Sequence, residues 1–343
     1  MRNLLITGAA GFIGSNFIHY WRDNNSNDKI IGLDNLTYAG NKANLLTLIN
    51  DGSIHFVKGS IGDFVLVREL LIENSINTIV HFAAESHVDR SIEGPDQFIE
   101  TNILGTHTLL KAAREVWLDR GDLEDHLFHH ISTDEVYGSL DVSDDAFTEK
   151  TPYAPNSPYS ASKAASDHLV RAWGETYGLP VIISNCSNNY GPYQYPEKLI
   201  PVVIENALAE ERIPVYGDGE NIRDWLFVGD HAKALIKIFQ DGKPGRTYNV
   251  GGNAERTNID VVSTICSALD ESVPRTGNKR YQELITFVTD RPGHDYRYAI
   301  DSTRLRSELS WEPVETFESG IRKTVDWYLS LQGREWISIV KGA

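Results

Sequence analysis

The stretch Asn3-Leu-Leu-Ile-Thr-Gly8-Ala-Ala-Gly11-Phe-Ile-Gly14 decides the fold class. The apolar residues 3–7 are followed by glycines at positions 8, 11 and 14, and an amphipathic segment begins at Phe12. Glycines permit a tight turn and a close approach of the backbone, and the N-terminus of the following helix presents free N–H groups to a pyrophosphate. The stretch therefore predicts a strand, a glycine turn and a helix that together bind a dinucleotide.

An acidic residue further along strengthens this prediction. Asp34 ends a second apolar run, 20 residues after Gly14. A carboxylate there can accept a hydrogen bond from a ribose 2′-hydroxyl and would repel a 2′-phosphate, which favours NAD over NADP. Glycines and an Asp-Asn pair also occur in turns for structural reasons alone, but their combination with strand and helix favours a cofactor site.

Short apolar runs alternate with longer amphipathic runs through the first half of the chain. Strands are expected at residues 3–7, 29–34, 54–57, 78–82, 127–131 and 180–184. Helices are expected at residues 12–22, 64–74, 95–117 and 158–177. Strands that alternate with helices and are almost wholly apolar form a parallel sheet covered on both faces. The fold class is therefore α/β, a Rossmann-type doubly wound parallel sheet.

The pattern changes after Ser184. The next residues are rich in Asn, Tyr and Pro, one more strand is expected at residues 246–250, and an amphipathic helix at 317–329. The 343 residues exceed one typical core, so a smaller C-terminal substrate-binding lobe is expected. We expect an NAD-binding domain over residues 1–187, with a returning strand and helix from about 225–251. The lobe of residues 188–343 would be interleaved with it around a shared cleft.

The composition excludes several classes of protein. The 48 acidic residues outnumber the 32 basic ones, and the net charge of −16 argues against binding to nucleic acid or to anionic membranes. No apolar run approaches the ~20 residues of a membrane span, and no signal-peptide cleavage pattern is present. The two cysteines, Cys186 and Cys266, lack metal-binding spacing and are expected to be buried. We expect a cytoplasmic protein without a metal site.

Two further motifs carry chemistry. Tyr159-Ser-Ala-Ser-Lys163 places a phenol and an ammonium on one face of a helix, where Lys163 is expected to lower the pKa of Tyr159 or to hold a nicotinamide ribose. Alone, this spacing is commonplace. In Ser132-Thr-Asp-Glu-Val-Tyr-Gly138, the carboxylates of Asp134 and Glu135 follow the fifth strand. Two acids in one cleft can have their pKa values pushed apart, so that one serves as acid and the other as base.

Together with the glycine turn, the Tyr-Lys pair resembles the extended branch of the short-chain dehydrogenase/reductase superfamily. Within it, the segment of residues 132–138 looks like the active-site segment of dTDP-glucose 4,6-dehydratases. Further stretches agree at residues 83–91, 185–192, 197–201, 223–225 and 290–295. The similarity runs from Asn3 to about Tyr328, which is nearly the whole chain.

The resemblance implies an NAD-dependent lyase that converts dTDP-glucose to dTDP-4-keto-6-deoxy-glucose. The sugar would be oxidised at C4, lose water across C5 and C6, and receive the hydride back at C6, so that tightly bound NAD is regenerated in each turnover. Tyr159, helped by Thr133, would take the C4 hydroxyl proton. Glu135 would remove the C5 proton and Asp134 would protonate the departing C6 hydroxyl, with Lys163 as the fifth catalytic residue.

The resemblance also assigns binding residues. Cofactor contacts are implied for Gly8, Gly11, Phe12, Ile13, Gly14, Asp34, Asn35, Leu36, Thr37, Ser60, Ile61, Phe82, Ala83, Ala84, Ser86, Thr101, Tyr159, Lys163 and Asn189. Substrate contacts are implied for Ser86, Thr133, Asn188, Lys198, Leu199, Tyr216, Arg223, Asn258, Asp290, Arg291 and His294. Ser60 departs from the aspartate usual in the family, which predicts weaker or more exchangeable NAD. A homodimer is implied through a four-helix bundle built from residues 95–117 and 158–177.

Other functions remain open at this point. A UDP-sugar 4,6-dehydratase, or a related nucleotide-sugar epimerase or decarboxylase, would keep the fold. The Asp134–Glu135 pair argues against the last two, which eliminate no C6 hydroxyl. A non-catalytic NAD-binding regulator is disfavoured because Tyr159, Lys163 and both acids are present. Thymine and uracil differ by one methyl group, so the sequence leaves the base open. It also leaves open whether the product feeds rhamnose or another deoxysugar.

Overall fold

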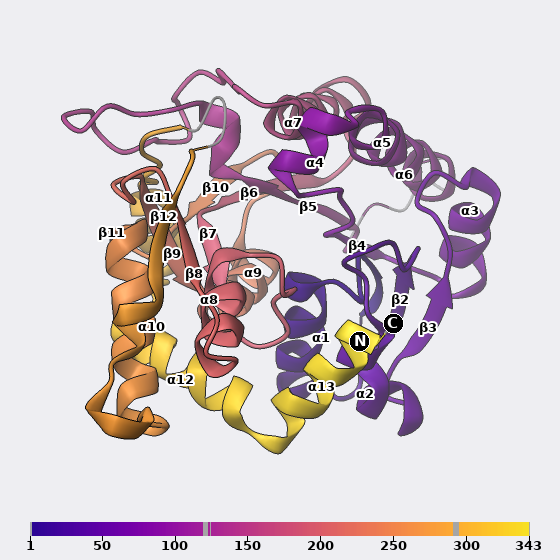
Figure 1. Cartoon of the computed structure of the whole chain (residues 1–343). Coiled ribbons are helices and arrows are strands. Elements are labelled where there is room, and N and C mark those ends of the chain that lie inside the picture. The colour runs from indigo at the N-terminus through magenta and orange to yellow at the C-terminus, as the bar shows by residue number, and fades with distance from the viewer. Residues whose placement is uncertain (1, 119–122, 124, 291–294, 343) are drawn as a thin grey trace.

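The computed structural model describes residues 2–118, 123, 125–290 and 295–342 (Figure 1). Its centre is a sheet of seven strands in the order β10-β6-β5-β4-β1-β2-β3, and every neighbouring pair is parallel. The strands are β1 (Asn3–Thr7), β2 (Lys29–Asp34), β3 (His55–Lys58), β4 (Thr78–His81), β5 (Leu127–Thr133), β6 (Val181–Cys186) and β10 (Thr247–Val250). This order confirms the predicted Rossmann-type fold class.

Helices cover both faces of the sheet (Figure 1). One face is covered by α1 (Phe12–Asn24), α9 (Val228–Asp241) and α11 (Thr303–Leu309). The other is covered by α3 (Phe64–Glu73), α6 (Thr106–Ala113) and α7 (Pro158–Tyr177). Successive residues of β1 alternate between the two cores, since Leu4 and Ile6 pack with the first group of helices and Leu5 with the second. Burial on both sides explains why the strands are apolar runs.

The remaining elements form a smaller lobe at the carboxyl edge of the sheet. One small sheet contains β7 (Asn188–Tyr190), β9 (Ile222–Phe227) and β11 (Glu255–Thr257), and a second pairs β8 (Ile213–Tyr216) with β12 (Ile285–Val288). Its larger helices are α8 (Leu199–Leu208), α10 (Asn258–Ser272), α12 (Phe317–Leu329) and α13 (Leu331–Gly342). A third core holds the lobe together, with Tyr190, Val203, Ile265 and Tyr328 among its buried members. The chain returns from this lobe to the large sheet through α9 and β10.

Short helices connect these elements. They are η1 (Lys42–Leu45), α2 (Leu46–Asn50), α4 (Val88–Glu93), α5 (Asp96–Phe98), η2 (Ile99–Gly105), η3 (Arg114–Leu118), η4 (Asp134–Tyr137), η5 (Thr276–Asn278) and η6 (Tyr281–Leu284). The ends of the expected strands agree with the ends of the observed strands to within two residues. β5 and β6 run on together to Thr133 and Cys186, because these two residues still pair with each other.

One expected helix, residues 95–117, has a different form. The structure divides it into α5, η2, α6 and η3, of which η2 and η3 are π-helical. A π turn accommodates an extra residue, which a helical periodicity of 3.6 residues cannot reveal, and such turns often lie beside functional sites. In η2 the buried Asn102 donates to the Glu85 carbonyl and to the Ser162 hydroxyl, which ties this turn to α7.

Several large apolar residues on the two helices of the expected four-helix bundle belong to the core of the chain. Leu109, Leu110, Trp117, Val170 and Trp173 are all buried against the sheet. Since the chain buries these side chains by itself, an interface on these helices would need other residues. The four-helix bundle stays a prediction.

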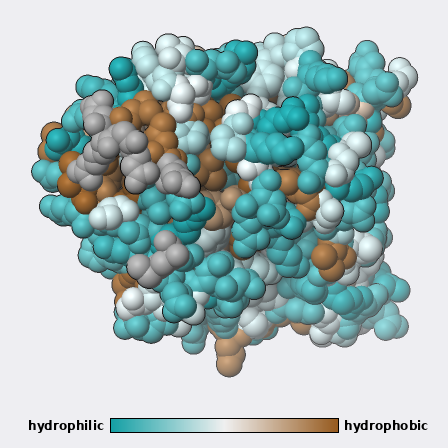
Figure 2. Space-filling view, turned by 180° about the vertical axis from the view of Figure 1, so that it is seen from behind, coloured by the Kyte–Doolittle hydropathy of each residue, from teal (hydrophilic) through white to brown (hydrophobic). Residues whose placement is uncertain are grey.

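The face of the molecule that points away from the viewer in Figure 1 is mainly hydrophilic, with smaller apolar areas (Figure 2). This agrees with a chain of 48 acidic and 32 basic residues. Among the described helices, none is long and apolar enough to cross a membrane.

The last helix connects the smaller lobe to the glycine turn. In α13, Trp336 packs among the rings of Tyr193, Trp327 and Tyr328. Its indole Nε1 donates to Asn44 Oδ1 at 2.5 Å, and Asn44 Nδ2 donates to the Ala10 carbonyl at 2.8 Å. The C-terminal helix therefore supports the turn that follows β1.

Replacing Trp336 tests this support. The side chain is 4% exposed, so Trp336→Ala should lower the free energy of unfolding by about 3 kcal/mol through lost packing and the unpaired Asn44 amide. Leu331→Ala, on the same helix but 82% exposed, is the matched control and should stay close to the parent. Urea unfolding measures both, and equal stabilities for the two variants would contradict this role of α13.

Candidate active site

A pocket lies at the carboxyl edge of the large sheet, between the two lobes. It is lined by the residues that follow β1, β2, β4, β5 and β6, together with the start of the smaller lobe. In the sheet, β2 and β3 lie on one side of β1, and β4, β5 and β6 lie on the other side. The strand order therefore reverses at β1. Such switch points are where open α/β sheets bind ligands.

The glycine turn shapes one end of the pocket. Gly8 has a φ of +66°, and a Cβ there would lie 2.7 Å from the Ala83 backbone nitrogen. A Cβ on Gly14 would lie 2.3 Å from the Gly8 carbonyl oxygen. Gly11 begins α1 without any side-chain cap, which leaves first-turn N–H groups for an anion. These residues fit the pyrophosphate of a dinucleotide.

Asp34 forms the adjoining wall. Its carboxylate accepts hydrogen bonds from the backbone nitrogens of Ala10, at 2.9 Å, and Leu36, at 2.7 Å. Burial raises the pKa of Asp34, and these two bonds oppose the rise. A carboxylate has about four acceptor positions, so it can also accept from a ribose hydroxyl.

The paired acids stand at the end of β5. Thr133 ends the strand, and its hydroxyl accepts from the Glu135 nitrogen at 3.3 Å and lies 3.4 Å from Asp134 Oδ1. Asp134 is 1% exposed. Burial, followed by the charge of Glu135, raises the pKa of Asp134 well above its usual value. Glu135 is less buried and lines the same pocket, so the two environments favour a protonated Asp134 beside Glu135.

Tyr159 and Lys163 come from the first turns of α7. Ser157 caps this helix in a reciprocal capping box with Ser160, which fixes where the helix begins. Lys163 is 4% exposed, and its Nζ donates to the Ile131 carbonyl at 2.8 Å. Burial lowers the pKa of Lys163, whereas the charge of Asp167 raises it.

The pKa of Tyr159 differs from our expectation. Burial, and then the charge of Glu135, raise it well above its ordinary value, while a hydrogen bond with Thr133 opposes the rise. The prediction that Lys163 lowers this pKa is wrong for this structure, because burial dominates and the ammonium bonds to the Ile131 carbonyl. A contact of Lys163 with a cofactor ribose stays a prediction.

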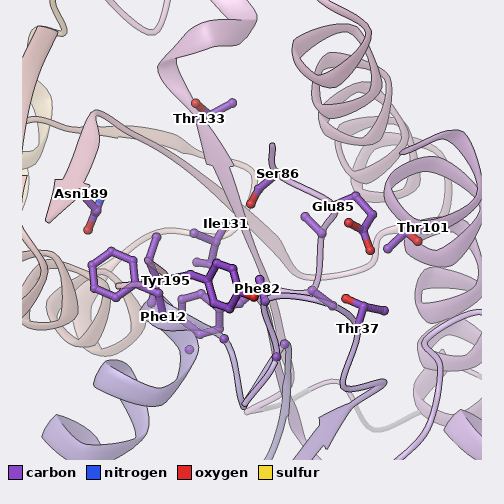
Figure 3. A pocket seen from close by; sticks show the side chains of 18 of the residues that line it. Phe12, Thr37, Phe82, Glu85, Ser86, Thr101, Ile131, Thr133, Asn189 and Tyr195 are labelled. Atoms are coloured by element: carbon purple, nitrogen blue, oxygen red, sulfur yellow. The ribbon is translucent and has the colours of Figure 1, made fainter. Parts of the chain in front are cut away.

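The structure brings most of the expected residues together. All five expected catalytic residues line the pocket, and so do the expected cofactor residues apart from Leu36, whose backbone nitrogen holds Asp34. Figure 3 shows Thr37, Glu85 and Thr101 on one side of the pocket and Asn189 and Tyr195 on the other.

The expected substrate residues are more scattered. Ser86, Thr133, Asn188 and Lys198 line the pocket. Five lie outside the lining, namely Leu199, Tyr216, Arg223, Asn258 and Asp290. Arg291 and His294 lie outside the described residues. The Arg223 guanidinium donates to the carbonyls of Ile222, Asp295 and Tyr296, which fixes its position in the smaller lobe.

Sequence reasoning missed several pocket residues. Glu85 is buried, and burial raises its pKa while a hydrogen bond with Thr37 opposes the rise. Its position just after β4 was a usable signal, since chemistry-bearing residues gather at carboxyl ends of strands. Glu197 lies 3.4 Å from Arg90 and 3.8 Å from the ring of His87. These contacts join the start of the smaller lobe to α4.

Among the described residues, no group of three or more His, Cys, Asp or Glu could hold a metal ion.

Known proteins resemble the whole chain. The family model described as GDP-mannose 4,6 dehydratase matches residues 5–324. A dTDP-glucose 4,6-dehydratase from Xanthomonas campestris is 57% identical over 334 residues, covering 97% of this chain and 94% of the relative. The chain belongs to the dTDP-glucose 4,6-dehydratase family.

Solved structures of this family have the same fold. The enzyme from Bacillus anthracis in complex with NAD superposes with a TM-score of 0.87 at 45% identity, covering 99% of this chain and 100% of that one. The enzyme from Streptomyces venezuelae, solved with NAD bound, gives a TM-score of 0.88 at 43% identity, with the same coverage. The predicted family is confirmed.

The raised pKa of Asp134 predicts a pH-dependent stability. A raised pKa in the folded protein means that, over a pH range above ~3.9, Asp134 holds a proton in the folded protein that it has released in the unfolded chain. The contribution of Asp134 to the stability of the parent therefore falls as the pH rises through that range, and Asp134→Asn lacks this contribution. The melting temperature of the variant should gain on the parent between acidic and neutral pH.

Thermal unfolding at several pH values measures this gain. Asp145→Asn, at an exposed position in the loop that follows η4, is the control, and the difference between its melting temperature and that of the parent should stay flat. A flat difference for Asp134→Asn as well would mean that Asp134 is charged in the folded protein.

Proposed function

We propose that this chain is a hydro-lyase that removes water from dTDP-glucose to give dTDP-4-keto-6-deoxy-glucose. The observation that carries the proposal is the buried Asp134, whose pKa is raised by burial and by the charge of Glu135, beside the less buried Glu135 in the pocket that also contains Tyr159. Eliminating a hydroxyl needs one group that gives a proton and one that takes a proton, and this pair supplies both. The identity of 57% with a dTDP-glucose 4,6-dehydratase supports the same substrate.

The pocket fits NAD as the cofactor. When bound, NAD would take the hydride from C4 of the sugar and later return it to C6. The glycine turn would hold the pyrophosphate, Asp34 the adenosine ribose and Lys163 the nicotinamide ribose. Ser60 lines the pocket, where its hydroxyl accepts from the Gly62 nitrogen at 3.1 Å. Weaker or more exchangeable NAD, because of this serine, stays a prediction.

The side chains would then move protons in sequence. Tyr159 would release its own proton to the solvent when the positively charged nicotinamide of NAD binds and lowers its raised pKa, and it would then accept the C4 hydroxyl proton. Glu135 takes the C5 proton while Asp134 gives its own proton to the C6 hydroxyl, which leaves as water. Glu135 finally returns its proton to C5. Each turnover thus leaves one more proton on Tyr159 and one fewer on Asp134.

Thr133 offers a path that resets this difference. Its hydroxyl lies 3.4 Å from Asp134 Oδ1 and shares a hydrogen bond with Tyr159. A hydroxyl both donates and accepts, so it can pass a proton from the phenol to the carboxylate.

The location and assembly of the chain complete the proposal. We infer a cytoplasmic enzyme, because both cysteines are free and buried, which fits a reducing compartment. We infer a homodimer through the helices of residues 95–117 and α7, supported by the exposed apolar side chains of Ile99, Leu104 and Tyr177 on them. The net charge of −16 supports the absence of a nucleic-acid partner.

The direct test is incubation of the purified protein with dTDP-glucose and no added cofactor. Mass spectrometry should find loss of one water with no net reduced cofactor, because bound NAD is regenerated. UDP-glucose in parallel tests the base, and faster loss of water from it would replace dTDP-glucose by a UDP-sugar. Absence of turnover with either sugar, even after NAD is added, would overturn the proposal.

Two variants separate the proposed roles. Glu135→Gln should still oxidise C4, and so accumulate reduced cofactor, but lose water ~10²–10⁴-fold more slowly. Tyr159→Phe should slow the oxidation itself by a similar factor. Tyr177→Phe, on the same helix but 40% exposed, is the matched control and should turn over like the parent. Absorbance of the reduced cofactor and mass spectrometry follow the two steps, and water loss at the parent rate in both active-site variants would refute these roles.

A further inference from the structure

A buried acidic residue behind the pocket has no part in the chemistry described so far. Asp167 lies on α7 and is 1% exposed. Tyr159, Lys163 and Asp167 follow one another at intervals of four residues, so they share one face of the helix. The helix that carries the two proposed catalytic groups thus carries a carboxylate one turn beyond them.

The surroundings of Asp167 are built to hold a charge. Its Oδ2 accepts hydrogen bonds from the hydroxyls of Ser132 and Tyr153, both at 2.9 Å, and from Asn185 Nδ2 at 3.3 Å. Its Oδ1 lies 3.1 Å from His130 Nε2. These donors come from β5, β6 and the segment before α7. A buried carboxylate is tolerated when it is hydrogen-bonded in this way and paired with an opposite charge.

The opposite charge is Lys163. Although burial pushes the pKa of Asp167 upwards, the neighbouring His130 ring and the charge of Lys163 hold it below its usual value. For Lys163 the balance runs the other way, since burial lowers its pKa and Asp167 is the first group that opposes the fall. Each of these two buried groups therefore favours the charged form of the other.

The other titratable groups around Lys163 supply no negative charge. His81 on β4 and His130 on β5 face it, and burial lowers the pKa of both, that of His130 to about 4. Cys186 on β6 also faces it, and burial raises its pKa to about 12, so it remains a thiol. Among these neighbours, Asp167 is the one that bears a negative charge at neutral pH.

We propose that Asp167 is a positioning residue for the dehydratase, whose carboxylate keeps Lys163 an ammonium directed at the Ile131 carbonyl and the floor of the pocket. This inference rests on the proposed function for its effect on turnover. Its effect on the protonation of Lys163 is independent of the substrate. Removing the charge of Asp167 should let Lys163 lose its proton at lower pH.

Turnover as a function of pH tests the effect on catalysis. In Asp167→Asn the fall of kcat at alkaline pH should begin about 1 pH unit lower than in the parent, with KM for the sugar unchanged. Asp167→Glu restores the charge and should return the fall towards the parent pH. Tyr153→Phe is the matched control, because it removes one hydrogen bond to Asp167 and no charge, and its fall should stay in place.

A second readout needs neither substrate nor turnover. In protein with lysine labelled at Cε, NMR follows the titration of Lys163, assigned by its absence in Lys163→Met. Asp167→Asn should titrate at lower pH than the parent. If the parent dehydrates no sugar but this shift is seen, the proposed function fails and the pairing stands. If the parent turns over and the shift is absent, the pairing fails alone.

Stability gives a third comparison if Asp167→Asn folds poorly. An unpaired buried charge is costly, so the double variant Asp167→Asn/Lys163→Met should melt at a higher temperature than Asp167→Asn alone. An unshifted alkaline fall and Lys163 titration in Asp167→Asn would overturn the proposal. So would an equal shift in Tyr153→Phe, or a double variant no more stable than Asp167→Asn, since each of these results assigns Asp167 to packing.

Discussion

The close approach of the glycine turn to the end of β4 is the constraint on which the rest of the site depends. A side chain on Gly8 would collide with the backbone of Phe82 and Ala83, so the two strands can meet at the switch point only through glycine. This contact sets the N-terminus of α1 above the crevice and opens the pocket beside it. Trp336 and Asn44 support the same turn from the far end of the chain, so both ends of the sequence stabilise the cofactor site.

Burial is the second physical theme of the site. Asp134, Tyr159 and Lys163 are nearly inaccessible to water, whereas Glu135 is more exposed. Burial disfavours the charged form of each inaccessible group, and specific neighbours then restore or withhold that charge. The charge of Asp167 favours the ammonium form of Lys163, whereas the charge of Glu135 disfavours the ionised forms of Asp134 and Tyr159. Keeping these groups away from water lowers the stability of the folded protein, as happens at many active sites.

Local patterns predict much of this fold. Residues 158–177 and 317–329 are helices with the expected bounds, since Ser157 and Thr316 cap them through side-chain hydrogen bonds. The parallel strands are found because burial on both faces makes them apolar runs. The π turns of η2 and η3 are missed, because an added residue per turn leaves no distinct period in a short helix.

The sequence predicts some features of the candidate site and misses others. The glycine turn and Asp34 follow from spacing, and the roles of Thr133, Asp134 and Glu135 follow from the family resemblance. Tertiary contacts decide the rest. The Lys163 ammonium bonds to the Ile131 carbonyl, and burial dominates the pKa of Tyr159. Neither could be read from residues four positions apart on a helix.

The central claim is that one pocket oxidises C4 and reduces C6 of the same sugar while NAD stays bound. The most direct test is turnover of dTDP-glucose that carries deuterium at C4. The account predicts product with that deuterium in the C6 methyl group and none released to water or to free cofactor. Deuterium lost to the solvent, or retained at C4 of a product that has lost water, would contradict it.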